Sequence, residues 1–399
     1  MSASKPVYLD YNSTTPCAKE VVDAMLPFFS EQFGNAANSH AHGRSAARAV
    51  EIARAQIAET IGCDLSDILF TSGATESNNL AILGVAKRAQ TRRKLVVSAV
   101  EHKSVLEPHR SLISQGFVVM EIPATRSGLI DIGRAEEIVD EDTLLVSLQA
   151  ANNETGVIQP IHEMVALAHR HGALVHCDAA QVLGKIVFSA RECDADFVSL
   201  SSHKAYGPKG IGVLVVKGTR SRAAMSPLFH GGGQEAGLRP GTLNVSGTVG
   251  FGRACWLCCD NYQNDSLRVS ALRDTLEMTI RGAIPWSYIN GAMTERLPGT
   301  TSLTIPGIPA DMLMANLPML CLSNGSACNS GAPEPSHVLL SMGLSRADAE
   351  STIRISLGRY TSEMEVQVAC RDIVAIALDL KGKLGFLAAE IEPAGGASP

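Results

Sequence analysis

The sequence predicts an α/β protein with a large domain on a mostly parallel, seven-stranded sheet and a second, small α/β domain. Between residues 68 and 216, seven short β-branched or apolar runs alternate with helical stretches, the pattern of a parallel sheet covered by helices. A glycine-rich loop, HGGGQEAGLRPGT, ends this alternation at 230–242. At 399 residues the chain is also too long for one simple core and fits two domains.

The elements follow in order. Helices are predicted near 18–33 and at 44–61, where Ala, Val and Ile recur at helical spacing. The strand runs are ILFTSG, KLVVSAV, FVVMEIPA, TLLVSLQA, ALVHCDA, FVSLSSH and GVLVV, and the last follows its predecessor so closely that we expect antiparallel pairing. A long helical region near 244–283 precedes strands near 300–305 and 352–357. We therefore predict a large domain at 17–260 and a small domain formed by 1–16 and 261–399.

Composition and charge narrow the function classes. The chain is 45% hydrophobic and 19% charged, which is ordinary for a globular protein, and its net charge of -6 argues against a direct nucleic-acid-binding surface. The N-terminal MSASKPVYLDYN has no apolar secretory run, and no stretch approaches 18 apolar residues. We expect no membrane span and a cytoplasmic protein.

The ten cysteines show no framework spacing, so most are expected to be reduced thiols. Cys255, Cys258 and Cys259 lie close together in FGRACWLCCD, which suggests a metal site. That stretch reads as an apolar helix, however, and no second ligand pair stands at zinc-finger spacing. We favour buried structural thiols and predict no metal.

Lys204 and Asp178 follow two of the predicted strands. Lys204, in SSHKAYGPKG, comes after FVSLS and before a glycine-rich turn. Ligands of doubly wound sheets bind at such strand ends, and a lysine there can form a Schiff base, although an exposed turn lysine is the simpler reading. Asp178 ends ALVHCD, with Gln181 three residues on. It can pair with a protonated pyridine nitrogen or simply cap the next helix.

Further polar residues follow other strands. In TSGATESNNL, Ala74 and Thr75 begin a helix whose free amides can bind a phosphate, or Ser72 and its neighbours form an ordinary N-cap. His102 in VEHKSVL can stack on a planar cofactor and move protons, and Asn153 lies in AANNETG. Taken singly, both are more often structural residues.

Two candidates lie in the C-terminal third. Cys328 lies in SNGSACNSG, a small, polar run in which an accessible thiolate can act as a nucleophile, whereas most unpaired cysteines are buried and inert. Arg354, in RISLGR, has the two-pronged guanidinium that binds carboxylates.

Nine motifs in order resemble one family. YLDYNSTTP, TSGATESNNLAI, EHKSVL, NNETGVIQP, HCDAAQ, SSHKAYGPKGIG, HGGGQEAGLRPGT, SNGSACNSG and IRISLGR look like the motif set of the cysteine desulfurases, which are pyridoxal 5′-phosphate (PLP) enzymes of the class V aminotransferase superfamily with fold type I. The match runs from about residue 7 to 365, nearly the whole chain.

The resemblance implies a role for each candidate. Lys204 would hold PLP covalently, Asp178 would pair with the pyridine nitrogen, Gln181 with the ring hydroxyl, and His102 would stack over the ring and help deprotonate the substrate. The phosphate would be bound by Ala74, Thr75, Ser201 and His203, and by Thr242 of the neighbouring subunit in a homodimer. Asn153 and Arg354 would hold the carboxylate of L-cysteine, and Cys328 would take up its sulfur as a persulfide while alanine leaves.

The resemblance leaves the pathway open. The loop after Cys328 is similar in length to that of the long-loop subgroup, whose members pass sulfur to an acceptor protein. The sulfur would serve iron–sulfur cluster assembly or a specialised use such as nitrogenase clusters, tRNA thiolation or DNA phosphorothioation. Asn329 and Pro240 depart from the residues common in the family, and the C-terminal tail differs from the housekeeping form. The alternatives are another PLP enzyme, such as a selenocysteine lyase, β-lyase or aminotransferase, or a non-catalytic sulfur carrier.

Overall fold

A seven-stranded sheet forms the centre of the structure, a computed structural model that describes residues 5–324 and 334–391. The strand order is β2-β8-β7-β6-β5-β3-β4. β8 is antiparallel to both β2 and β7, and the other neighbouring pairs are parallel, so the predicted sheet and its antiparallel strand are confirmed. The strands are β2 (Ile68–Thr71), β3 (Lys94–Ser98), β4 (Val118–Ile122), β5 (Thr143–Gln149), β6 (Leu174–Asp178), β7 (Phe197–Ser201) and β8 (Gly212–Val216).

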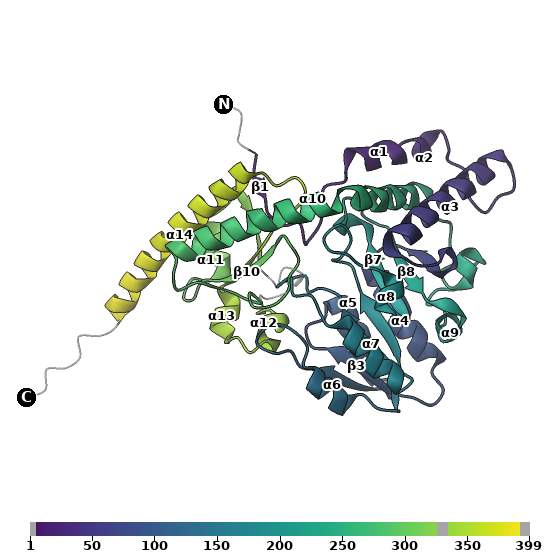
Figure 1. Ribbon diagram of the computed structural model, residues 1–399, viewed down its shortest axis with the longest axis horizontal. Coiled ribbons are helices and arrows are strands. Elements are labelled where there is room, and N and C mark those ends of the chain that lie inside the picture. The colour runs from purple at the N-terminus through teal and green to yellow at the C-terminus, as the bar shows by residue number, and fades with distance from the viewer. Residues whose placement is uncertain (1–4, 325–333, 392–399) are drawn as a thin grey trace, which may run out of the picture.

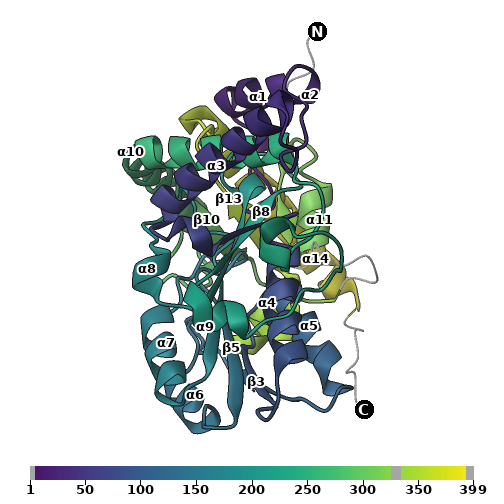
Figure 2. The same cartoon turned by 90° about the vertical axis from the view of Figure 1, so that its right-hand side faces the viewer.

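Helices cover both faces of this sheet (Figure 2). Successive residues of one strand enter different cores: Leu95 packs with α4 and α5 on one side, and Val96 packs into the larger cluster on the other. Because both faces are buried, the strands read as continuous apolar runs. The covering helices are α4 (Ala74–Arg88) and α5 (Lys103–Ile113) on one face, and α6 (Ile132–Ile138), α7 (Ile161–Arg170) and α8 (Ala190–Cys193) on the other; α9 (Gly218–Ala223) follows β8.

A smaller unit is built on a four-stranded antiparallel sheet of order β12-β13-β10-β9. The N-terminal arm joins it, because β1 pairs in parallel with β11 and Leu9 is buried in the same apolar cluster as Ile353 and Ile373. Its elements are β1 (Val7–Tyr8), β9 (Tyr288–Ile289), β10 (Thr300–Thr304), β11 (Leu320–Cys321), β12 (Ser323–Asn324), β13 (Thr352–Ser356), α11 (Ala310–Ala315), α12 (His337–Ser341), α13 (Arg346–Glu350) and α14 (Glu363–Ile391).

The long helix α10 (Val245–Ala283) runs from the large unit to the small one (Figure 1). It packs on α3 (Ala41–Ile61) in the large unit and on α14 in the small unit. The domain boundary predicted near residue 260 falls inside this continuous helix, and the division at that residue stays a prediction. The helix expected at 18–33 is two helices, α1 (Lys19–Met25) and α2 (Pro27–Ser30), because Pro27 has no N–H to donate to the preceding turn.

Two findings concern the class of protein. No helix in the described part of the chain is long and apolar enough to cross a membrane. Cys255 and Cys258 are buried in α10, Cys259 is exposed, and no group of three or more His, Cys, Asp or Glu residues within 5–324 and 334–391 is placed to hold a metal ion.

Candidate active site

A cavity of ≈ 520 Å³ lies at the carboxyl ends of β5, β6 and β7, where a doubly wound sheet binds its ligands. It brings together most of the residues singled out in the sequence, although they are spread over 280 positions of the chain. Lining the cavity are Ala74, Thr75, His102, Asn153, Asp178, Gln181, Ser201, His203, Lys204 and Arg354. Thr242 does not line it and is exposed, and Cys328 lies outside the described residues.

Lys204 stands in a 3₁₀ turn, Ser202–Lys204, directly after β7. Its Nζ donates to the backbone oxygens of Asn12, at 2.6 Å, and Ser13, at 2.7 Å. The same Asn12 oxygen accepts a bond of 2.9 Å from Gln181 Nε2, and Asn12 Oδ1 accepts from Lys185 Nζ at 3.1 Å. The N-terminal arm therefore closes one side of the cavity, and Asn12 is a site residue that the sequence analysis quoted in a motif but did not select.

Asp178, the last residue of β6, is buried at the cavity floor with 7% of its surface exposed. Asn78 Nδ2 donates to its Oδ2 at 2.8 Å, and the backbone N–H of Ala180 donates to its Oδ1 at 2.9 Å. Both oxygens are thus held by neutral donors, which fixes the plane of the carboxylate toward the cavity.

His102 is the N-cap of α5, and its ring faces the same cavity. The backbone N–H of Ser104 donates to Nδ1 at 3.1 Å, so the ring proton belongs on Nε2. Burial lowers the pKa of His102, and the nearby Lys204 lowers it further while Asp178 opposes the shift. The imidazole is therefore neutral around pH 7 and can both donate from Nε2 and lie against an apolar ring.

At the other end of the cavity, α4 begins at Ala74 with its free amides pointing inward. A Cβ on Gly212 would lie 2.6 Å from the Gly73 Cα, so the two segments can approach this closely only with glycine at position 212, and Gly73 itself has φ +155°, which other residues rarely adopt. Ser201 and His203 lie beside this turn. Burial lowers the pKa of His203 to about 4, and its Nδ1 lies 3.1 Å from Thr14 Oγ1.

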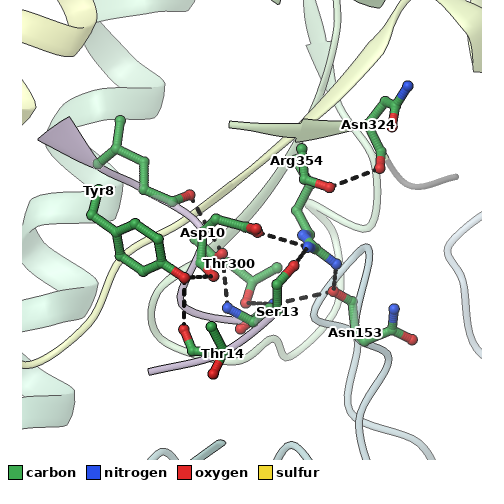
Figure 3. A network of polar contacts seen from close by, with 12 residues as sticks. Tyr8, Asp10, Ser13, Thr14, Asn153, Thr300, Asn324 and Arg354 are labelled. Atoms are coloured by element: carbon green, nitrogen blue, oxygen red, sulfur yellow. Dashed lines mark hydrogen bonds and ion pairs between the residues drawn. The ribbon is translucent and has the colours of Figure 1, made fainter. Parts of the chain in front are cut away.

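Arg354, on β13, also lines the cavity, and Figure 3 shows its guanidinium group beside Asp10, Ser13 and Asn153. Its Nη2 bonds Asp10 Oδ1 at 2.7 Å and Ser13 Oγ at 2.6 Å, and its Nη1 donates to the backbone oxygen of Asn153 at 3.0 Å. Its Nε is buried and has no hydrogen-bond partner among the described residues. A guanidinium held in this way has a donor left for a carboxylate.

The chain matches known proteins over most of its length. Residues 7–368 match the family model described as aminotransferase class-V. The cysteine desulfurase IscS of Anaeromyxobacter sp. (strain Fw109-5) is 43% identical over 371 residues, 92% of each chain. A NifS-like protein of known structure superposes with a TM-score of 0.87 at 36% identity, covering 93% of this chain and 99% of that one, and SspA in complex with cysteine does so with a TM-score of 0.78 at 38% identity, covering 89% and 99%.

The chain belongs to the class V aminotransferase family and, within it, to the cysteine desulfurases. Enzymes of this family depend on PLP. The described residues fit that cofactor: one cavity offers an amine, a buried carboxylate for a pyridinium nitrogen and a helix N-terminus for a phosphate. The N-cap residue of α4, Gly73, makes no side-chain bond to the first amides of the helix, so no cap competes with a phosphate there.

Proposed function

We propose that this cysteine desulfurase converts L-cysteine to L-alanine in the cavity described above and transfers the sulfur to Cys328. The observation that carries the proposal is that Lys204, Asp178 and Arg354 line one cavity although they come from three different elements. PLP chemistry on an amino acid requires an amine to hold the cofactor, a carboxylate for the ring nitrogen and a guanidinium for the substrate carboxylate.

Each residue has a proposed part in holding the cofactor. The Lys204 amine binds it covalently in the resting enzyme, Asp178 pairs with the ring nitrogen and Gln181 with the ring hydroxyl. His102, neutral by burial, lies against the ring. The phosphate is bound at the start of α4 by Ala74, Thr75, Ser201 and His203.

The chain's own groups then carry the reaction. PLP, when bound, supplies an electron sink for negative charge at the substrate Cα. Arg354 and Asn153 hold the substrate carboxylate, which orients the Cα–H bond toward the Lys204 amine that accepts its proton. The Cys328 thiolate attacks the substrate sulfur: an S–S bond forms, the Cβ–S bond breaks, and its electron pair passes to Cβ. Cβ then takes up a proton, equivalent to the one that the Cys328 thiol released, and Cα regains its proton from the Lys204 ammonium. The substrate leaves as alanine, and a persulfide remains on Cys328.

We further propose a homodimer in the cytoplasm. Thr242 is exposed and outside the cavity, as expected of a residue that completes the phosphate site of a second subunit. Large apolar side chains are exposed near the N-terminal helices, with 56% of Leu26, 63% of Phe29 and 67% of Phe33 accessible. The nine described cysteines are all free thiols, which suits a reducing compartment.

The sulfur acceptor is proposed to be a protein. A persulfide on a long loop suits direct transfer to a partner, and iron–sulfur cluster assembly is the first pathway to test, because the curated relative from Anaeromyxobacter is named IscS. Specialised thiolation of tRNA or DNA phosphorothioation is the second.

The test is a turnover assay with L-cysteine that records alanine and sulfide, using the wild type, Cys328→Ser and, as a matched control, Cys259→Ser on the exposed face of α10. Cys328→Ser is expected to lose alanine and sulfide together, by at least about 100-fold, since no other group replaces a nucleophile. The cofactor spectrum should not change. A Cys328→Ser protein that still forms both products would contradict the proposal and point to a selenocysteine lyase, whereas sulfide formed with pyruvate in place of alanine would point to a β-lyase.

A further inference from the structure

Asn78 has a position that the proposed reaction does not use. It lies in the second turn of α4, completely buried, between the sheet and the cavity floor. Its Nδ2 donates to Asp178 Oδ2 at 2.8 Å and to Ser104 Oγ at 2.9 Å. Its Oδ1 lies 3.1 Å from His176 Nε2. All three contacts are between groups far apart in the sequence, so one amide joins three elements.

Ser104 continues this chain of hydrogen bonds to His102. Its Oγ lies 2.8 Å from His102 Nδ1. The NH₂ group of Asn78 can only donate, so Ser104 Oγ must be the acceptor in that bond. The hydroxyl proton of Ser104 is then left to donate to His102 Nδ1. The single lone pair of Nδ1 is therefore shared by two donors, the Ser104 hydroxyl and the Ser104 backbone N–H. Both bonds favour the ring tautomer with its proton on Nε2.

His176 fixes the orientation of the Asn78 amide and therefore the direction of this series of hydrogen bonds. It is completely buried in β6, and burial lowers its pKa to about 3, so it is neutral at pH 7. Its Nε2 lies near Asn78 Oδ1 and 3.0 Å from Ser199 Oγ. An Nε2–H that donates to Asn78 Oδ1 sets which end of the amide is the oxygen, and so leaves the NH₂ group facing Asp178 and Ser104.

We propose that Asn78 and Ser104 are positioning residues that couple the Asp178 carboxylate to the His102 imidazole through one buried chain of hydrogen bonds. The two side chains assigned to the cofactor ring are thereby oriented together. The inference rests on the proposed function, because Asp178 and His102 serve the ring only if PLP binds in this cavity. A residue with only acceptors at position 78 cannot make this link, because it would place a lone pair against the acceptor oxygen of Asp178 in place of a donor.

The charged groups around His102 bear on any titration of its ring. Asp178 on β6 raises its pKa, whereas Lys204 after β7, His337 on α12 and Lys103 on α5 lower it. None of these four is changed by Ser104→Ala, which removes one hydroxyl and no charge. A shift in the titration of His102 in that variant therefore reports the lost hydrogen bond.

The first measurement is a pH titration of His102 by NMR in holoenzyme carrying ¹⁵N-labelled histidine. Ser104→Ala is expected to raise the pKa of His102 by about 0.5–1 unit, because a hydrogen bond to the unprotonated Nδ1 is lost. The Nδ1 resonance should move as well. The control is Ser111→Ala in the same helix, whose hydroxyl bonds the Pro108 backbone oxygen, and it should leave the titration unchanged.

The second measurement is the dissociation constant of PLP from the apoprotein. Asn78→Ala is expected to weaken PLP binding by about tenfold, because the side chain of Asp178 loses one of its two hydrogen-bond donors. Asn79→Ala, which removes a surface amide bonded to the Thr75 backbone oxygen, is the control and should bind PLP like the wild type.

Two outcomes overturn the inference: a His102 that titrates in Ser104→Ala as in the wild type, or an Asn78→Ala apoprotein that is folded and binds PLP with unchanged affinity. If Asn78→Ala does not fold, the Ser104→Ala titration decides alone. Neither readout needs turnover, so a holoenzyme that shows both shifts but releases no alanine from L-cysteine contradicts the proposed reaction and leaves the coupling standing.

Discussion

The floor and the wall of the cavity are built in different ways. The cavity floor consists of Asp178, His102 and Ser104, and the completely buried Asn78 and His176 lie beneath it. All five residues come from the large unit and are joined mainly by neutral hydrogen bonds. The cavity wall consists of Asp10, Asn12, Ser13, Asn153 and Arg354, which come from the N-terminal arm, the loop after β5 and the small unit. The wall is held by an ion pair with 7% of the Arg354 side chain and 20% of the Asp10 side chain exposed.

This difference indicates two kinds of binding. A buried network whose donors and acceptors are matched is costly to rearrange, so the floor suits a cofactor that stays bound. An ion pair next to an unpartnered Nε can exchange one carboxylate for another, so the wall suits a substrate that enters and leaves in every turnover. Substitutions in the floor should therefore weaken PLP binding, whereas substitutions in the wall should raise KM for the substrate.

The largest effect is expected on the floor. Asp178→Asn removes the charge proposed to pair with the ring nitrogen. Both carboxylate oxygens now accept hydrogen bonds, and the substitution replaces one of them with an NH₂ group that cannot accept. We expect turnover to fall by about 100- to 1,000-fold, together with weaker PLP binding. Alanine formation and the cofactor absorbance measure the two effects. The control is Asp372→Asn, which changes a carboxylate paired with the exposed Arg371. Near-normal turnover in Asp178→Asn would show that the Asp178 charge is not needed for the reaction.

A smaller and different effect is expected on the wall. Arg354→Gln should raise KM for L-cysteine by about 30-fold or more, as expected when one partner of a buried charge pair is removed. PLP affinity should stay within about twofold of wild type, because the cofactor contacts proposed here lie on the floor. Arg354→Lys should recover only part of the loss, since an ammonium lacks the guanidinium fork.

Asp10→Asn is the matched control for Arg354→Gln. It breaks the same ion pair but leaves the guanidinium in place to bind the substrate. A KM that rises as much in Asp10→Asn as in Arg354→Gln would mean that the pair is purely structural, and the contrast between floor and wall would fail.

The sequence predicted the parts of this cavity that depend on strand ends. Asp178 ends β6, and Lys204 comes three residues after β7, so their convergence follows from the rule that parallel strands present their carboxyl ends on one edge. The antiparallel β8 was predicted from its short connection to the preceding strand, and the long helix was predicted as a helical region near 244–283. These features are local, or follow from the topology of the sheet.

The residues that the sequence analysis missed depend on tertiary contacts. Asn78 meets Asp178 across 100 positions of the chain, and the Asn12 backbone oxygen meets Lys204 across 192. No local pattern distinguishes Asn78 from Asn79, yet one is buried at the floor and the other is exposed on the surface. The split between α1 and α2 was, in contrast, readable from Pro27. The role of Cys328 stays a prediction, because the residue lies outside the described part of the chain.

The smallest effect concerns a buried carboxyl beside the wall. Glu154 follows Asn153, has 5% of its surface exposed, and accepts a bond of 2.5 Å from Ser336 Oγ. Burial raises the pKa of Glu154 to about 7, although the Ser336 bond and the charges of Arg354 and Lys103 oppose the shift. The fold therefore prefers the protonated form. This contribution to stability is fully present below the usual pKa of about 4.5 and is lost as pH rises through about 7.

Glu154→Gln keeps the group neutral at every pH and leaves an oxygen to accept from Ser336. At pH 5 the variant and the wild type should unfold at similar temperatures, and at pH 8 the variant should be the more stable by about 1–3 kcal/mol, since each pKa unit corresponds to about 1.4 kcal/mol. Thermal unfolding at the two pH values measures the difference. Glu350→Gln, in an exposed pair with Arg346, should show no such dependence on pH. If Glu154→Gln is less stable than the wild type at pH 8, the carboxylate is held there as an ion by Arg354 and Lys103, and a second fixed negative charge then lies buried behind the wall.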